Sequence, residues 1–288
     1  MIRSMTAFAR VGGEAAGAEL TWELRSVNHR YLDIALRLPE ELRGLEQAVR
    51  ERASMRLGRG KLEVVLRWRQ GSAEGGEMLI DQDRLSALLH ACREVEKRSA
   101  EASSPGVMEL LRWPGVVREP EIDTASIQNQ ALALLDQALG ELVETREREG
   151  AKIRDLLLTR CEGIAEQVAR VRARLPEVRG RIRDKLEARL AELSAPADSN
   201  RLEQELVYLA QKMDVDEELD RLEGHVAEVR RVLERDEPVG RRLDFLMQEL
   251  NREANTLASK SADQDTTAAA VELKVLIEQM REQVQNVE

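Results

Sequence analysis

Hydrophobic residues in the first 70 positions alternate with polar ones, which is the period of half-buried strands. The alternation is clearest over 20–24, 32–38 and 62–68, and residues 4–11 form a further predicted strand. The apolar residues of 39–58 instead share one helical face, in a segment that begins at a proline and is followed by turn-forming glycine. The predicted order of elements in this part is β-β-β-α-β.

The next stretch has shorter and less regular patterns. Residues 78–80 predict a short strand, and Asp81 is placed to cap a helix that continues to about Arg98. The segment 100–120 is broken by three prolines. We expect it to be a loop that packs Trp113 against another element.

From Ser126 onward, hydrophobic positions recur with a helical period almost without interruption. A pattern this long indicates a coiled-coil arm or hairpin, which we expect to break near Pro176, and such arms often build oligomers. Residues 194–200 form the clearest linker. Four helices of a final bundle are predicted at 200–213, 215–235, 238–259 and 264–287.

Composition agrees with a mostly helical protein. Of the 288 residues, 42% are hydrophobic and 34% are charged, so the chain can bury a substantial core and is too apolar to be disordered. Aromatic residues make up only 2%, so the core must come mainly from Leu, Val and Ala, which favours long helices. The predicted class is α+β, with a small N-terminal β-rich domain at 1–80, a helical middle region with a long arm at 81–197 and a C-terminal helical bundle at 198–288.

Membrane and disulfide chemistry are not expected. The sequence has no run of the roughly 20 apolar residues that span a bilayer, and its start lacks the apolar core of a signal peptide. We therefore expect a soluble, cytoplasmic protein. Cys92 and Cys161 lie far apart without CxxC spacing, which favours buried or idle reduced thiols.

Charge is distributed unevenly along the chain. The net charge is −10, yet residues 1–70 hold 13 Lys and Arg against 9 Asp and Glu, whereas residues 198–288 hold 12 against 22. A basic end can bind phosphate and an acidic end can hold divalent cations. Solvated helix faces explain most acidic excess in most proteins, so charge alone leaves both interpretations open.

A run of hydrogen-bond donors lies between two of the predicted strands. The segment 25–31 contains the donors Arg25, Asn28, His29, Arg30 and Tyr31 and no acidic residue. Arginine binds phosphate in bidentate fashion and tyrosine can stack on an unpaired base, so this turn suits RNA. Arg59 and Lys61 add two cations around Gly60, which allows a backbone to approach. The alternative is an ordinary polar turn with Tyr31 packed into the core.

Carboxylates flank the apolar stripes of the final helices. Glu249 and Glu253 are one turn apart beside the stripe of the third predicted helix, and Glu272 lies beside that of the fourth. His225, together with Glu218, lies on the corresponding flank of the second. An imidazole and several carboxylates that converge from neighbouring helices can bind Mn²⁺ or Mg²⁺.

A more ordinary interpretation of these flanks is open as well. Glutamates on helices often pair with arginines, as Glu249 could with Arg252 or Arg242, and a lone histidine at a helix seam is more often a structural hydrogen-bonding group. Cations that suit phosphate lie near the ends of the third predicted helix, namely Arg241, Arg242 and Lys260.

Several longer motifs resemble those of a known family. They are SMTAFAR at 4–10, WELRSVNHRYLDIALRLPE at 22–40, RGK at 59–61, RWPGVV at 112–117, REREG at 146–150, VGRRLDFLMQELNREANTLASKS at 239–261 and VELKVLIEQMREQVQNVE at 271–288. With these motifs the chain resembles bacterial YicC/YloC-type proteins along its whole length. Ala262, in SKSADQD, stands where we expect Asn, which weakens any role for that position.

The resemblance implies an endoribonuclease that acts on single-stranded or structured RNA, including small regulatory RNAs, with a divalent metal ion, typically Mn²⁺. It also implies a ring-like homohexamer that closes around RNA. From the matching motifs we assign RNA binding to Arg25, Asn28, His29, Arg30, Tyr31, Arg59, Lys61, Arg241, Arg242 and Lys260. Metal binding is assigned to His225, Glu249, Glu253 and Glu272. Catalysis is assigned to His225, Glu249 and Glu253, and to Glu278, which lies farther from the apolar stripe.

Metal-assisted hydrolysis of RNA phosphodiester bonds is the resulting hypothesis. An RNA-binding adapter that presents RNA to a separate nuclease is an alternative, since it needs the basic turn but no carboxylate cluster. A helical scaffold fits the long arm but gives no reason for the donor-rich turn. The sequence leaves open whether the basic turn and the acidic bundle meet within one chain or between subunits.

Overall fold

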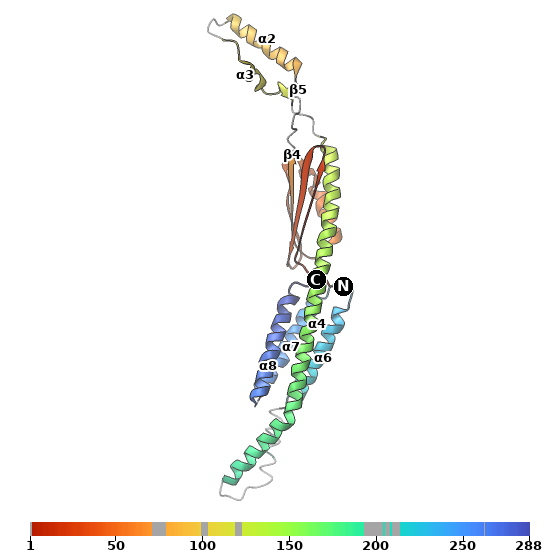
Figure 1. Ribbon diagram of the computed structural model, residues 1–288, viewed down its shortest axis with the longest axis vertical. Coiled ribbons are helices and arrows are strands. Elements are labelled where there is room, and N and C mark those ends of the chain that lie inside the picture. The colour runs from red at the N-terminus through yellow and green to blue at the C-terminus, as the bar shows by residue number, and fades with distance from the viewer. Residues whose placement is uncertain are drawn as a thin grey trace.

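The computed structural model describes residues 2–70, 79–98, 103–118, 123–192, 204, 208, 214–261 and 263–288. A small lobe, a sheet region and a helical bundle follow one another in this order along one long axis (Figure 1). The predicted α+β class is confirmed. The predicted linker 194–200 lies outside the described residues, as does the predicted helix 200–213 apart from residues 204 and 208.

Four strands form the sheet, and their pairing gives a mixed topology. They are β1 (Ala7–Ala15), β2 (Ala18–Val27), β3 (Leu32–Arg37) and β4 (Gly60–Gln70), in the spatial order β1-β2-β4-β3. Neighbouring strands are antiparallel except β3 and β4, which are parallel. The 3₁₀ helix η1 (Glu40–Leu45) and helix α1 (Glu46–Arg56) provide the crossover that a parallel pair requires. The predicted β-β-β-α-β order is confirmed.

The first strand begins later than the sequence pattern predicts. It starts at Ala7 instead of residue 4, because Ser4 forms an isolated antiparallel bridge with Val287 near the other end of the chain. The backbone N–H of Met5 also donates to the carbonyl of Asn286, at 2.7 Å. A partner distant in sequence thus takes the backbone groups that we expected to join the sheet.

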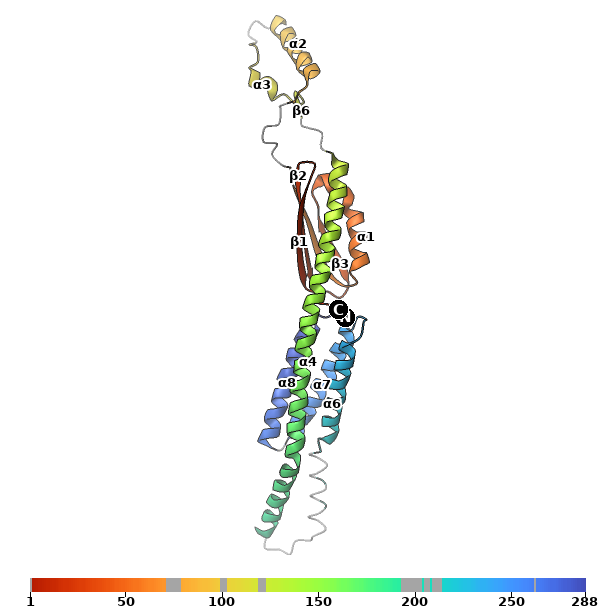
Figure 2. The same cartoon turned by 45° about the vertical axis from the view of Figure 1, so that its right-hand side comes forward.

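One face of the sheet is covered and the other is open. Alternate residues such as Leu20, Trp22 and Leu24 point inward and are fully buried. Figure 2 shows α1 and the first part of α4 (Thr124–Glu192) against this inner face. The indole N–H of Trp22 donates to the carbonyl of Ala131 on α4, at 2.7 Å. Charged side chains occupy much of the open face, as is usual for a one-sided sheet.

Helix α4 is shared by the sheet region and the bundle. Its first half packs on the sheet and its second half joins the bundle core. The predicted break near Pro176 is wrong, because the helix continues through this proline to Glu192. A proline removes one helical hydrogen bond but does not end a helix that is held by packing on both sides, and Leu175 and Val178 are buried here. Figure 1 shows α4 changing direction toward its C-terminal end.

Three further helices complete the bundle. They are α6 (Asp216–Leu233), α7 (Gly240–Lys260) and α8 (Gln264–Val284), close to the predicted positions. Their apolar stripes meet those of α4 in one core. Among the residues that the structure describes, no helix is both long and apolar enough to cross a bilayer.

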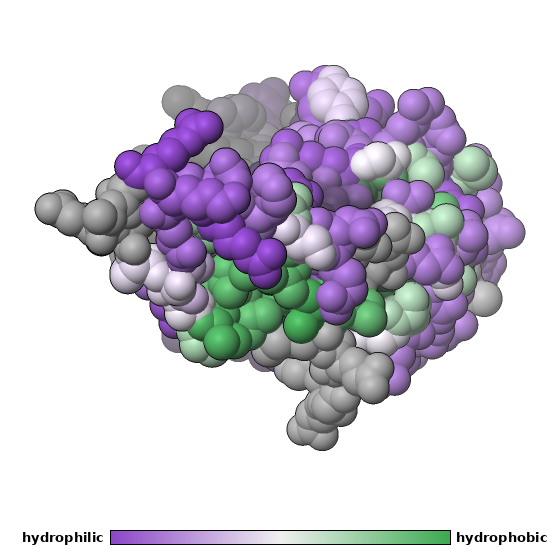
Figure 3. Space-filling view, turned by 90° about the horizontal axis from the view of Figure 1, so that it is seen from above, coloured by the Kyte–Doolittle hydropathy of each residue, from purple (hydrophilic) through white to green (hydrophobic). Residues whose placement is uncertain are grey.

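A small lobe lies at the far end of the sheet region. It contains β5 (Leu79–Ile80), α2 (Gln82–Arg98), α3 (Val107–Leu111) and β6 (Val117–Arg118). The predicted helix after Asp81 is confirmed, and the Asp81 carboxylate accepts from the N–H of Arg84. The segment 100–120, which we expected to be a loop, contains α3 and β6, and Trp113, which we expected to pack against another element, is 56% exposed. Figure 3 shows an apolar patch on this end of the molecule.

A buried arginine joins the sheet region to the bundle. Arg146 of α4 is 1% exposed, and its Nε donates to the carbonyl of Ser4 at 2.7 Å. Its Nη2 donates to the Glu288 side chain at 2.9 Å and to the carbonyl of Arg59 at 3.3 Å. Burial lowers the pKa of Arg146, and the nearby Glu288 carboxylate opposes this shift. This one side chain therefore contacts both ends of the chain and the start of β4.

Candidate metal centre and nucleic-acid interface

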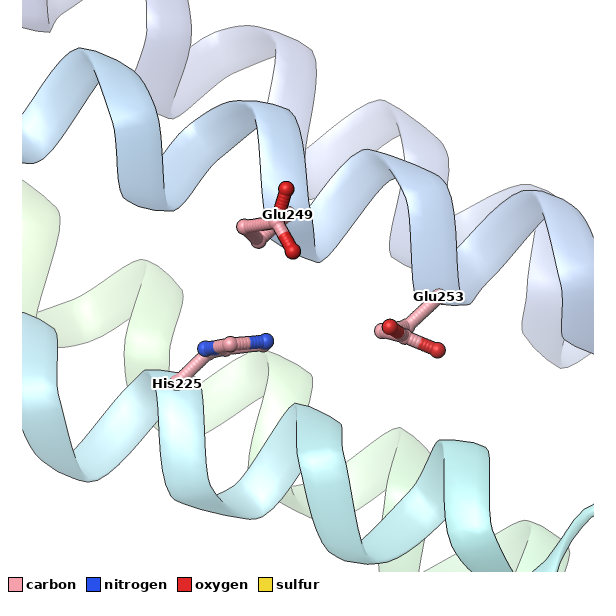
Figure 4. Close-up of side chains that lie close together, drawn as sticks. All are labelled: His225, Glu249 and Glu253. Atoms are coloured by element: carbon pink, nitrogen blue, oxygen red, sulfur yellow. The ribbon is translucent and has the colours of Figure 1, made fainter.

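An imidazole and two carboxylates converge between α6 and α7. His225 lies on α6, while Glu249 and Glu253 lie one turn apart on α7, and all three side chains enter the space between the helices (Figure 4). One possible ligand atom from each of them lies within 4.8 Å of the other two. We call these residues the acidic cluster. Flanking buried residues such as Val226 and Leu250 fix the two helices in this orientation.

Burial makes the acidic cluster electrostatically costly without a cation. Glu253 is only 3% exposed, and its carboxylate contacts Nη1 of Arg221 at 3.4 Å. Hydrogen bonds to Glu217 and then to Glu253 raise the pKa of Arg221. Glu249 is more open, and its carboxylate lies 3.9 Å from Arg252. Two carboxylates this close repel each other unless a positive charge lies between them or beside them.

The donor set fits a divalent cation. One imidazole nitrogen with two carboxylates suits Mn²⁺, which accepts both donor types, and also allows Mg²⁺ with added waters. Within the described part of the chain, Glu272 and Glu278 lie outside the acidic cluster. Both are exposed on α8, and Glu278 pairs with Arg281 at 3.3 Å. The structure therefore brings together three of the five side chains that the sequence suggested for metal binding or catalysis.

Lys260 has a different environment from the one expected for an RNA-binding cation. Its Nζ donates to the Glu218 carboxylate and to the carbonyl of Asp214, both at 2.9 Å. Glu218 is 7% exposed, so Lys260 neutralises a buried charge at the far end of α7. At 1.5 Å per residue, it lies about 29 Å along the helix from Arg241.

A cleft opens where the sheet region meets the bundle. Two adjoining cavities of about 460 and 270 Å³ share Arg59, Gly240 and Arg241 in their walls. We call them together the junction cleft. Asn28, Arg30 and Tyr31 of the basic turn line it as well, so five of the predicted RNA-binding residues meet here.

Local contacts hold the turn in place at the cleft. The side-chain amide of Asn28 donates to the carbonyl of Gln285 at 2.6 Å, and Nε of Arg59 donates to the carbonyl of His29 at 2.9 Å. Tyr31 is 61% exposed, which excludes the alternative that it packs into the core. The guanidinium of Arg30 lies 5.2 Å from the centre of the Tyr31 ring.

The other predicted RNA-binding residues do not line the junction cleft. Arg25 and Lys61 alternate with buried neighbours and belong to the open face of the sheet. The ring nitrogen Nδ1 of His29 lies 3.0 Å from the carbonyl of Tyr31, within the turn itself. Arg242 pairs with Glu228 across the α6–α7 seam, at 3.3 Å.

The basic and acidic sites are both formed within one chain. Helix α7 contributes Arg241 to the junction cleft and Glu249 and Glu253 to the acidic cluster. The helical rise places these positions about 12 to 18 Å apart along the axis. In a single copy of the chain, the two sites share a helix but do not touch.

Comparisons with known proteins match the whole length of the chain. A family described as the N-terminal region of YicC-like endoribonucleases matches residues 2–155, and one described as their C-terminal part matches residues 171–288. The chain belongs to the YicC-like endoribonuclease family. A relative named probable endoribonuclease YicC from Haemophilus influenzae is 43% identical over 288 residues, and another of the same name from Clostridioides difficile is 30% identical over 293 residues. Each alignment covers all of both chains.

Two residues of the YicC-like chain that shape the cleft escaped the sequence interpretation. Glu288 lines the cleft and Arg146 holds its side chain from behind, yet Arg146 looked like one of several polar residues in the long helix. A signal was present, because Arg146 and Gly150 continue the four-residue spacing of the apolar stripe that includes Leu142. A charged residue on a buried stripe indicates a specific partner.

Proposed function

We propose that this chain is an endoribonuclease that cleaves RNA with the help of a divalent cation held by His225, Glu249 and Glu253. The observation that carries the proposal is the convergence of these three side chains on one point, with Glu253 almost fully buried. Buried carboxylates are retained when something positive compensates them. The names of the full-length relatives support the reaction class.

The chain's own residues would act in separate roles. His225 and Glu249 approach from opposite helices and would hold the cation from two sides, while Glu253 contributes the most buried charge. When bound, a divalent cation supplies Lewis-acid catalysis at a phosphate. A carboxylate oxygen of Glu249 or Glu253 that does not contact the cation can accept a proton from water.

RNA binding is proposed for the junction cleft. Its arginines give a net acidic protein a local surface that attracts phosphate. Arg25 and Lys61, on the open face of the neighbouring sheet, would extend this basic surface. Action on small regulatory RNAs, Mn²⁺ as the preferred ion and assembly as a homohexamer are expectations from the family resemblance, and they form part of the proposal.

Substitution within the α6–α7 seam tests the metal-dependent step. Glu253→Gln and His225→Ala are expected to lower the rate of Mn²⁺-dependent RNA cleavage by about 100-fold or more, because each removes a ligand. Glu218→Gln is the matched control. It removes another buried carboxylate of the same seam, whose partner is Lys260 and which lies outside the acidic cluster. Circular dichroism checks that all variants fold.

Two outcomes would contradict the proposal. Purified Glu253→Gln protein that cleaves as fast as the unchanged chain would leave the acidic cluster without a role and favour the RNA-binding adapter. Products that end in a 2′,3′-cyclic phosphate and form in EDTA would favour acid–base catalysis by His29 or His225 on the 2′-hydroxyl. Analysis of the RNA ends separates these cases.

A further inference from the structure

The junction cleft keeps an unusual amount of uncompensated positive charge. Among the described residues, none of the three arginines in its walls, Arg30, Arg59 and Arg241, has a carboxylate within 4 Å. Of the two acids that line it, Glu288 already pairs with the buried Arg146 at 2.9 Å. Asp244 accepts only from the neutral side chain of Gln248, at 3.0 Å, so its charge offsets one of the three arginines and an excess of two positive charges remains. The cleft is therefore built to receive an anion.

The start of α7 adds to this preference. Its first turn reads Gly240-Arg241-Arg242, and the residue before it, Val239, has no side-chain acceptor to cap the free N–H groups. By contrast, α6 begins with three acidic residues and Asp263 caps α8 through the N–H of Thr266. Acids or caps normally compensate the positive end of a helix. The N-terminal end of α7 lies in the wall of a cleft that is already lined by arginine. A phosphate bound there would compensate both the helix end and the arginine side chains.

An aromatic ring stands at the same cleft. Tyr31 is 61% exposed, and Arg30 lies 5.2 Å from its ring centre. Bases stack on exposed tyrosine rings only when they are unpaired, because pairing and stacking within a duplex cover their faces. The larger cavity, of about 460 Å³, has the size of a small-molecule site and is much too small for a helix of RNA.

We infer that the junction cleft is a binding site for one unpaired nucleotide, whose base stacks on Tyr31 while its phosphate binds Arg59, Arg241 and the first turn of α7. This inference specifies an unpaired nucleotide as a feature of the substrate, so it rests on the proposed endoribonuclease function and deepens it. It needs no metal ion. Binding therefore selects RNA with a single-stranded nucleotide about 12 to 18 Å along α7 from the acidic cluster.

Binding without cleavage tests this site. The full chain, in EDTA, is titrated into a fluorescently labelled single-stranded RNA of four nucleotides and into a duplex. It is also titrated into four variants of the short RNA, each of which lacks the base at one position. Tyr31→Ala and removal of the critical base are each expected to weaken binding about tenfold, because base–aromatic stacking contributes about 1–3 kcal/mol. The two changes together should weaken binding no further than either alone. Tyr31→Phe should bind within about twofold of the unchanged chain, since the ring is kept.

The phosphate part of the site has its own readout. Arg241→Ala is expected to weaken binding about tenfold and to reduce the slope of log affinity against log salt by about one. Arg93→Ala is the charge-matched control, because this exposed arginine lies on α2, in the small lobe and outside the cleft. Trp113→Ala is the aromatic control in the distant lobe. Both controls should bind like the unchanged chain.

Failure of this inference is distinguishable from failure of the proposed function. The nucleotide site would be overturned if Tyr31→Ala weakened the binding of intact and base-free RNA equally. It would also be overturned if the duplex bound more tightly than the short single strand. Either result would leave metal-dependent cleavage intact. In EDTA, the Glu253→Gln protein is expected to keep its affinity for the short RNA, whether or not this variant cleaves RNA. Loss of its affinity would show that the cleft does not bind independently of the acidic cluster and would also overturn the inference.

Discussion

Among individual residues, Arg221 is placed to compete with a metal ion. It contacts Glu253 at 3.4 Å and also pairs with Glu217, one turn earlier on α6. A cation in the acidic cluster must share or replace this guanidinium as the partner of Glu253. Arg221→Ala is therefore expected to tighten Mn²⁺ binding a few-fold, about fivefold at most, because the guanidinium no longer competes with the cation for the Glu253 carboxylate. Isothermal titration calorimetry of the protein without RNA measures this change.

Arg172→Ala provides the control for Arg221. Arg172 reaches α6 from α4, pairs with Asp220 and Glu223, and is exposed to a similar extent. Its removal should leave the Mn²⁺ affinity unchanged. Weaker Mn²⁺ binding by Arg221→Ala protein would mean that the guanidinium supports the site instead of competing for it.

The two cysteines should differ sharply in reactivity. Burial raises the pKa of Cys161 to about 11, whereas Cys92 is only partly buried on α2. The thiol form of Cys161 therefore persists to high pH, and the stability that it contributes is lost only as the pH rises above about 9. At pH 8, iodoacetamide should modify Cys92 and spare Cys161 in the folded protein, as mass spectrometry can show. Modification of both at equal rates would indicate that α4 opens readily.

At the level of elements, α4 depends on a glycine where the chain's beginning crosses it. A Cβ atom at Gly150 would lie 2.2 Å from the carbonyl oxygen of Ile2, whereas nothing lies within 4 Å of a Cβ at Gly180 in the same helix. Gly150→Ala is expected to destabilise the protein by about 1–3 kcal/mol despite alanine's better helix propensity. Gly180→Ala should stabilise it by up to about 1 kcal/mol. Urea unfolding measures both, and equal effects would mean that the close approach to Ile2 is not rigid.

Sequence periodicity predicts the helices and strands well, but it predicts the residues at which they begin and end less well. Alternation located the strands and a helical period located α6, α7 and α8, because each buries one face. It could not show that α4 continues through Pro176, since that depends on packing from neighbouring elements. It also led us to expect Trp113 to pack against another element, whereas α2 and α3 of the small lobe have no buried residues and Trp113 is mostly exposed.

For the whole molecule, the Arg146–Glu288 pair connects the sheet region to the bundle. Glu288→Gln leaves a guanidinium that is 1% exposed without its counter-charge, so it is expected to lower the free energy of unfolding by about 3 kcal/mol. Arg146→Met combined with Glu288→Gln should recover part of this loss, because no buried charge is then left unpaired. Urea denaturation of the single and double variants measures the recovery. A double variant no more stable than Glu288→Gln alone would show that the two side chains do not act as a pair.

The candidate sites were predictable to different extents. Helical phase placed His225, Glu249 and Glu253 on facing flanks, since these positions are fixed by two adjacent helices. Helical phase could not show that Glu272 lies outside the acidic cluster, because this depends on how α8 is rotated within the bundle. The composition of the junction cleft was beyond any local pattern, because Arg59, Arg241 and Glu288 meet only through long-range packing.

The way the junction cleft is assembled also fixes when it can exist. Its walls combine Asn28, Arg30, Tyr31 and Arg59 with Gly240, Arg241, Gln285 and Glu288, and the bond from Asn28 to the carbonyl of Gln285 spans 257 positions. During synthesis, the sheet and α4 can form from earlier residues, since domains fold as their sequences emerge. The nucleotide pocket must wait until residues 285–288 have left the ribosome. A nascent chain that has not yet released these residues therefore cannot hold RNA in this pocket, even when the transcript that encodes it lies alongside.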